Sequence, residues 1–222
     1  MMAPALKNHS MKIFHLASAL MFAGLTLFST PANTKEWAFD VYLDKSKIGQ
    51  HVFSLKNNVL TSKAKFNVKI LFMDAYRYDH QANEQWQGNC LTRLTSDTVE
   101  NKVVSHVEAN LSGANLTVED GKRTQMLPAC TMTFAYWNPK ILSQTKLLNP
   151  QNAEWLDTKI SKLGTDTIEV KDKKIEAERY QIDGTLEGKN KLKIELWYSD
   201  SNEWLALRST TPDGYIINYK LR

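Results

Sequence analysis

Apolar and polar residues alternate with a period of two along most of the chain, and this pattern constrains the fold more than any other feature. In EWAFDVYL, residues 36–43, every second residue is apolar, and in KAKFNVKI, residues 63–70, the polar positions are mainly lysines. Successive side chains of a strand point to opposite faces, so the pattern predicts strands with one buried face. Further strands are predicted at 48–55, 75–86, 90–100, 102–111, 114–121, 154–164, 166–172, 174–184, 190–200, 203–211 and 214–222.

Turn residues separate these segments at short, regular intervals. Asp120-Gly121, Gly164 and Pro212-Asp213-Gly214 are examples. Many short strands at such spacing are typical of antiparallel meanders that curl into barrels. We therefore expect a mainly β fold, a highly curved antiparallel sheet that forms a half-barrel or open barrel.

Only one long region, residues 131–148, departs from the alternation. Asn138 is suited to cap a helix and Pro139 to begin one. After them, one helical face would carry Ile141, Leu142, Thr145 and Leu148. The pattern predicts a turn at 133–137 followed by a short helix of about two to three turns, and the curved sheet would wrap around this central helix.

The first 32 residues read as a signal peptide. Lysines precede an apolar run, Ile13–Phe28, that is shorter than the ~20 residues of a membrane-spanning helix. Small residues follow it, which favours cleavage near Ala32 over a membrane anchor, and either Met1 or Met11 would serve as the start. We expect a periplasmic protein that does not span the membrane after cleavage, with residues 33–222 as a single domain.

The charge pattern argues against a nucleic-acid partner. The net charge is only +4, and the lysines are spread along the predicted strands instead of forming one basic face. Cys90 and Cys130 are the two cysteines of the chain. An even pair in an oxidising compartment predicts a disulfide bond, with a catalytic thiol as the alternative.

Several strings resemble a known family. FAYWNPKIL, LLNPQNAEW and YRYDHQANEQWQGNCLTRL are similar to an uncharacterised family of secreted proteobacterial proteins, known as a domain of unknown function with a FAYWNP motif. The C-terminal portion, from ERYQIDG to GYIINYKL, resembles exported half-barrel domains that are similar to periplasmic lipoprotein carriers. That resemblance implies a curved sheet that holds acyl chains beneath a helical lid, and it implies no ligand-binding residue.

Aromatic and polar side chains gather on two segments that would line a cavity. In strand 75–86, one face carries Tyr76, Tyr78, His80, Ala82, Glu84 and Trp86, either as an amphipathic cavity wall or as cross-strand aromatic pairs. In the irregular region, Phe134, Tyr136 and Trp137 would either plug the mouth of the half-barrel or cover a ligand as a lid. The candidate ligand-binding residues are Tyr76, Tyr78, His80, Trp86, Phe134, Tyr136 and Trp137.

The sequence lacks the usual motifs of catalytic and cofactor sites. His51, His80 and His106 show no close spacing of the kind that metal ligands share, and there is no GxSxG or phosphate-binding loop. We therefore assign no catalytic residue, metal or cofactor. The sequence favours a protein that binds or carries an apolar or amphipathic ligand, such as a lipid or an acylated molecule. The alternatives are an envelope interaction or structural module, and a hydrolase or isomerase that uses His80 with Glu84 or Tyr78.

Overall fold

The computed structural model describes residues 34–70, 73–211 and 213–222, which belong to one compact unit. The predicted signal peptide, residues 1–32, lies outside the described residues. No helix in the described part of the chain is long and apolar enough to cross a membrane.

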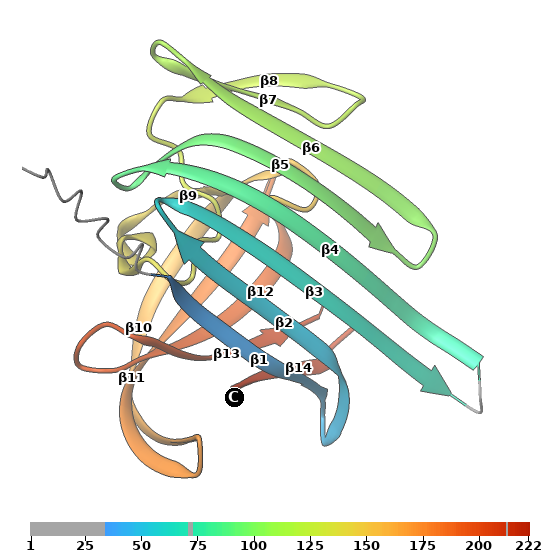
Figure 1. Ribbon diagram of the computed structural model, residues 1–222, viewed down its shortest axis with the longest axis vertical. Helices are drawn as coiled ribbons and strands as arrows, with labels where there is room; N and C mark the ends of the chain where they lie inside the picture. Colours follow the sequence, from blue (N-terminus) through green and yellow to red (C-terminus); the bar gives the residue numbers. More distant parts are fainter. Residues whose placement is uncertain (1–33, 71–72, 212) are drawn as a thin grey trace, which may run out of the picture. The chain divides into compact units, whose positions relative to one another are not determined.

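Fourteen strands in the described residues form one sheet in which every neighbouring pair is antiparallel. The first series is β1 (Lys35–Leu43), β2 (Ser46–Lys56), β3 (Val59–Ile70), β4 (Met73–Gln87), β5 (Cys90–Glu100), β6 (Val103–Ser112), β7 (Asn115–Glu119) and β8 (Thr124–Pro128). The second series is β9 (Lys146–Leu148), β10 (Trp155–Val170), β11 (Lys173–Leu186), β12 (Lys189–Tyr198), β13 (Trp204–Thr210) and β14 (Ile216–Leu221). Figure 1 follows the first series from blue to yellow-green and the second from gold to red.

The strand order is β8-β7-β6-β5-β4-β3-β2-β1-β14-β13-β12-β11-β10-β9. Each series is a meander, and the two are joined where β1 pairs with β14, with Phe39 opposite Leu221. The sheet is not closed, and its edge strands are β8 and β9. This arrangement confirms the prediction of a mainly β, antiparallel fold.

Alternation along the strands places one face in the core. In β1, Trp37, Phe39 and Val41 are buried, as the period-two pattern predicts. Both strand series contribute to the same core, because Trp204 of β13 lies 4.5 Å from Phe39 and 5.0 Å from Phe53 between ring centroids. A single sheet that buries residues of both its halves together must be strongly curved.

The predicted central helix is wrong. Pro139–Ser143 forms one 3₁₀ turn, which Asn138 caps by accepting a hydrogen bond from the backbone N–H of Lys140 at 3.0 Å. The chain then continues into β9, where Leu148 lies opposite Trp155 of β10. The start signals for the helix were therefore correct, but the backbone groups of 146–148 are satisfied by pairing with β10 instead of by further helical turns.

The predicted turn at Gly164 is also wrong. Trp155–Val170 is one strand, β10, and the register shifts between Lys162 and Gly164. Gly164 has a φ of 130°, a conformation that glycine adopts readily. The glycine thus marks a bulge within a long strand instead of a break between two strands.

Candidate functional site

The segment that connects the two edge strands, residues 129–145, is fixed against the sheet, and we call it the plug segment. The predicted disulfide is confirmed, since Cys130 of the plug segment is bonded to Cys90 at the start of β5. The backbone N–H of Leu91 donates to the carbonyl of Thr131 at 3.2 Å, and that of Leu148 donates to Met132 at 2.9 Å. The plug segment is therefore attached to strands of both series.

The aromatic side chains of the plug segment pack against the core. Trp137 meets Trp86 of β4 edge to face, with 5.6 Å between ring centroids, and Tyr136 lies 5.4 Å from Trp204. The hydroxyl of Tyr198 donates a hydrogen bond to the backbone carbonyl of Tyr136 at 2.6 Å. These contacts hold the plug segment in one position over the inner face of the sheet.

A cavity of about 430 Å³ lies between the sheet and the plug segment. Its walls come from β2, β3, β4, β10, β12, β13 and β14, from the plug segment and from the loop Asn149–Glu154. Six of the seven candidate residues line it: Tyr76, Tyr78, His80, Phe134, Tyr136 and Trp137. Trp86 does not line the cavity, because it packs behind Trp137 and donates to Glu84.

An aromatic row forms one wall of the cavity. Tyr76, Tyr78 and His80 follow one another on β4, with successive centroid separations of 6.5 and 6.0 Å. Phe66 of β3 stacks on Tyr78 at 5.1 Å. The alternation in strand 75–86 correctly predicted which residues share this face.

Glu84 is a buried carboxyl group at the cavity, with a relative exposure of 4%. Its Oε2 accepts hydrogen bonds from Trp86 Nε1 and Thr133 Oγ1, both at 3.1 Å. Removal from water raises the pKa of Glu84 to about 7, and the two hydrogen bonds oppose this effect. The sequence placed Glu84 on the cavity face and named it as a partner of His80 in the hydrolase or isomerase alternative, but not as a ligand-binding residue.

Two buried histidines complete the polar part of the cavity. Nδ1 of His80 lies 2.9 Å from the hydroxyl of Thr98, and burial lowers the pKa of His80 to about 4. Nε2 of His51 lies 2.7 Å from the hydroxyl of Ser62, and burial also lowers the pKa of His51 well below its usual value. Both rings, 6.4 Å apart between centroids, are therefore neutral at neutral pH.

The contact between Ser62 and His51 has the spacing of a nucleophile and its base. In a catalytic triad, however, a carboxylate orients the histidine through its other nitrogen. Within the described residues, Nδ1 of His51 is buried and has no hydrogen-bond partner. The pair therefore lacks the orienting group. Sequence reasoning missed it because Ser62 and His51 meet only through the register between β2 and β3.

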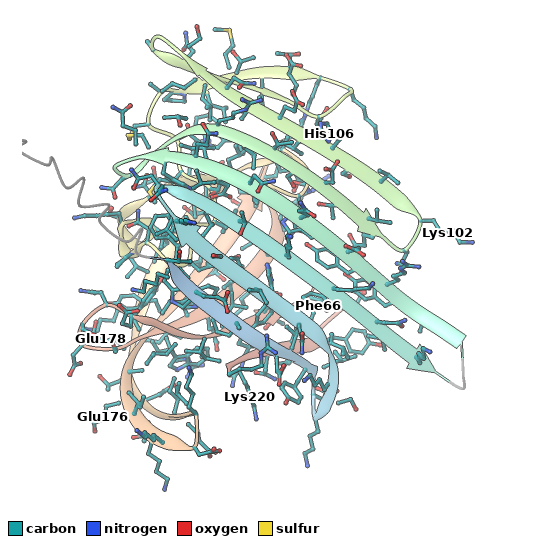
Figure 2. The ribbon with its side chains drawn as sticks, in the orientation of Figure 1. Phe66, Lys102, His106, Glu176, Glu178 and Lys220 are labelled. Carbon is teal, nitrogen blue, oxygen red and sulfur yellow. A yellow bond between two sulfur atoms is a disulfide. The ribbon has the colours of Figure 1, made fainter. Side chains whose placement is uncertain are left out.

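The third histidine of the described chain, His106, lies apart from this pair. It is exposed on β6 (Figure 2). Its Nδ1 is 2.7 Å from the carboxylate of Asp97. Among the residues that the structure describes, no three His, Cys, Asp or Glu side chains are grouped so that they could hold a metal ion.

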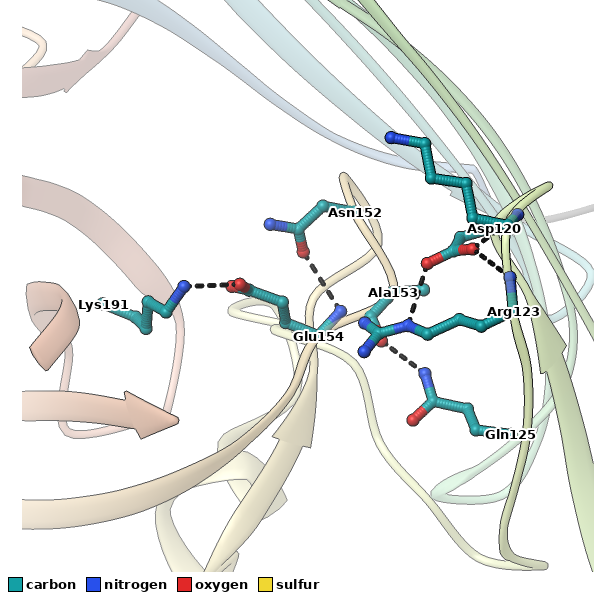
Figure 3. Close-up of polar contacts among 8 residues, drawn as sticks. Asp120, Arg123, Gln125, Asn152, Ala153, Glu154 and Lys191 are labelled. Atoms are coloured by element: carbon teal, nitrogen blue, oxygen red, sulfur yellow. Dashed lines mark hydrogen bonds and ion pairs between the residues drawn. The ribbon is translucent and has the colours of Figure 1, made fainter. Parts of the chain in front are cut away.

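A polar loop borders the open side of the cavity. In the loop Asn149–Glu154, the carboxylate of Glu154 pairs with Lys191 of β12 at 2.7 Å, and Asn152 accepts a hydrogen bond from the Glu154 backbone (Figure 3). On its other side, the amide of Gln125 from β8 donates to the carbonyl of Ala153 at 2.5 Å. The loop is thus tied to both strand series, and its exposed residues mark the side where the cavity meets solvent.

Comparisons with known proteins identify a family and a shared fold. A family model described as "Domain of unknown function (DUF6134)" matches residues 39–222. The chain is also similar to the crystal structure of a beta-barrel-like protein of domain of unknown function DUF1849 from Brucella abortus, with a TM-score of 0.61 and 14% sequence identity. That match covers 86% of this chain and 96% of the other. At this identity it shows a shared fold alone. The search of curated proteins found no match.

Proposed function

Because the chain belongs to the DUF6134 family, a domain of unknown function, its role has to be inferred from the cavity, and we propose that it binds or carries an apolar or amphipathic small molecule there. The observation that carries this proposal is the cavity of about 430 Å³ between the sheet and the plug segment. Its volume falls within the ~300–1,000 Å³ that is usual for ligand pockets.

The lining of the cavity supports an amphipathic occupant. Aromatic and aliphatic side chains such as Phe53, Phe66 and Leu207 supply apolar contact area, and Glu84 and His80 supply polar atoms. A ligand pocket typically combines such apolar walls with a few placed polar groups. Lipids and acylated molecules have both chemical parts, and a periplasmic location, as the signal peptide predicts, would give access to them.

The attachments of the plug segment support a fixed wall instead of a moving lid. The Cys90–Cys130 disulfide and the hydrogen bond from Thr133 to Glu84 would both resist its displacement. We therefore propose that the ligand enters beside the loop Asn149–Glu154, where the lining residues reach solvent. The plug segment then supplies the inner aromatic surface of the binding site.

Two measurements test the proposal. Native mass spectrometry and lipid extraction of protein purified from the periplasm should reveal a bound amphiphile. The purified protein should also increase the fluorescence of N-phenyl-1-naphthylamine, a neutral apolar probe. Ala82 lines the cavity and is buried, so Ala82→Leu should fill space and weaken probe binding.

The matched control is Ala75→Leu, at an exposed position of the same strand, which should leave probe binding unchanged. Circular dichroism would verify that both variants are folded. If the wild type carries no extracted lipid and does not bind the probe, the binding proposal is wrong.

An interaction module is the second candidate, and one observation favours it. Val103 and Val104, at the start of β6, are 67% and 72% exposed. Exposed apolar side chains mark surfaces that meet other proteins where they gather into a patch. Crosslinking in cells should capture a partner at the start of β6 in the wild type, and this capture should be lost in a Val103→Lys/Val104→Lys variant. Capture that persists in the variant would remove this candidate.

A further inference from the structure

We propose that the cavity takes amphiphiles whose head group donates a hydrogen bond and carries no negative charge, and that Glu84 receives this head group. This inference rests on the binding function proposed above and specifies the chemical class of the ligand. Alcohol and amine head groups share the required chemistry, whereas carboxylate, sulfate and phosphate head groups lack it.

The charges that line the cavity are unfavourable to an anion. Lys191 is the only lysine or arginine among the described lining residues, and its ammonium group is already paired with Glu154 at 2.7 Å. The two lining histidines are neutral, because burial lowers the pKa of both His51 and His80. An anionic head group would therefore lose its hydration without gaining an unpaired positive charge.

Glu84 presents an open acceptor in the same cavity. Both of its hydrogen bonds, from Trp86 and Thr133, are accepted by Oε2. Oε1 has no hydrogen-bond partner among the residues that the structure describes, although the side chain lines the cavity. A buried carboxyl group with one unpaired oxygen favours a ligand that brings a donor, and it repels a second carboxylate.

The phenol groups that line the cavity are also uncharged. Tyr78, Tyr136 and Tyr219 line the cavity, and burial raises the pKa of each phenol above its ordinary value. A neutral phenol both donates and accepts hydrogen bonds, so it complements a ligand hydroxyl or amine. The polar surface of the cavity thus consists of neutral groups, the ion pair of Lys191 with Glu154, and the carboxyl group of Glu84.

Three amphiphiles with the same alkyl chain test the inference: decanol, decylamine and decanoate. Each would compete with N-phenyl-1-naphthylamine for the full mature protein at pH 8, where most of Glu84 is ionised. Decylamine and decanoate would be kept below their critical micelle concentrations, and decanol below its solubility limit. We expect decanol and decylamine to displace the probe at concentrations about tenfold or more below that of decanoate. The ranking of decanol against decylamine then distinguishes a hydroxyl from an amine head group.

Glu84→Gln tests the role of the carboxyl group, because it keeps the size and removes the negative charge. It should strengthen decanoate binding and narrow the difference in affinity between decanoate and decanol. Glu119→Gln, at an exposed position of β7, should leave that difference unchanged. If decanoate binds as tightly as decanol to the wild type, this inference is overturned and the binding function stands. If none of the three displaces a bound probe, this inference is likewise overturned, whereas a wild type that neither carries an extracted lipid nor binds the probe overturns the binding function itself.

Discussion

The hydroxyl of Thr133 donates a hydrogen bond to Glu84 Oε2 at 3.1 Å, and this contact joins the plug segment to the middle of β4. Both residues are buried, with relative exposures of 0% and 4%. The contact therefore fixes the position of the only carboxyl group that is buried at the described cavity wall, and it couples the plug segment to the protonation of that group.

Thr133→Val should destabilise the protein by about 1–3 kcal/mol, because it removes a hydrogen bond to a buried, partly ionised carboxyl group. The loss should be larger at pH 8 than at pH 5, because the ionised form of Glu84 accepts the stronger hydrogen bond. Urea denaturation at the two pH values measures it. Thr145→Val, at an exposed position of the same segment, is the control. Equal losses in the two variants would show that the contact contributes nothing.

Glu84→Gln should remove a dependence of stability on pH. The pKa of Glu84 is about 7 in the folded protein and 4.5 for the unperturbed group, so the folded state holds a proton that the unfolded state has released. Stability from this group is therefore complete below about pH 4.5 and falls as pH rises through 7, by about 3 kcal/mol in total. Between pH 4.5 and pH 8, the free energy of unfolding of the variant relative to wild type should rise by that amount. A difference in free energy of unfolding that stays constant over this pH range would contradict the raised pKa of Glu84.

His80→Asn should reveal a dependence of the opposite sign. The pKa of His80 is about 4 when folded and 6.5 for the unperturbed group, so the unfolded state binds the extra proton. Wild-type stability from this group is complete above about pH 6.5 and is lost on acidification towards pH 4, by about 3 kcal/mol. On acidification from pH 6.5 to pH 4, the free energy of unfolding of wild type relative to the variant should therefore fall by that amount. The pH dependences of stability from Glu84 and His80 have opposite signs at mildly acidic pH. They are therefore separated only by comparing each variant with wild type at each pH.

Replacement of both cysteines, Cys90→Ala with Cys130→Ala, should cost roughly 4 kcal/mol. The bond closes a loop with a sequence separation of 40, and its loss allows the unfolded chain more conformations. Thermal unfolding of the double variant should match that of the reduced wild type. A double variant as stable as the oxidised wild type would show that the hydrogen bonds of the plug segment suffice.

The features that were predicted best are those that follow from the burial of one face of each strand. Alternation located most strands and the correct face of β4, because each strand buries every second residue whatever its partner. The sequence also predicted a helix after Asn138, because the capping signals there are genuine. Nothing in the local sequence reveals that Leu148 pairs with Trp155 in a strand. The contacts of Glu84 with Thr133 and of His51 with Ser62 were likewise hidden, since they depend on register and on the path of the plug segment. The proposed role of the cavity residues stays a prediction.

The pairing of β1 with β14 has a consequence for how the protein folds. Each series can form by local hairpins, but Phe39 meets Leu221 only after the loop formed by most of the chain has closed. Contacts between such distant residues slow folding, and until they form, β1 and β14 expose unpaired backbone edges. The join between the two series is therefore the step at which a folding chain is most open to aggregation and to help from a chaperone.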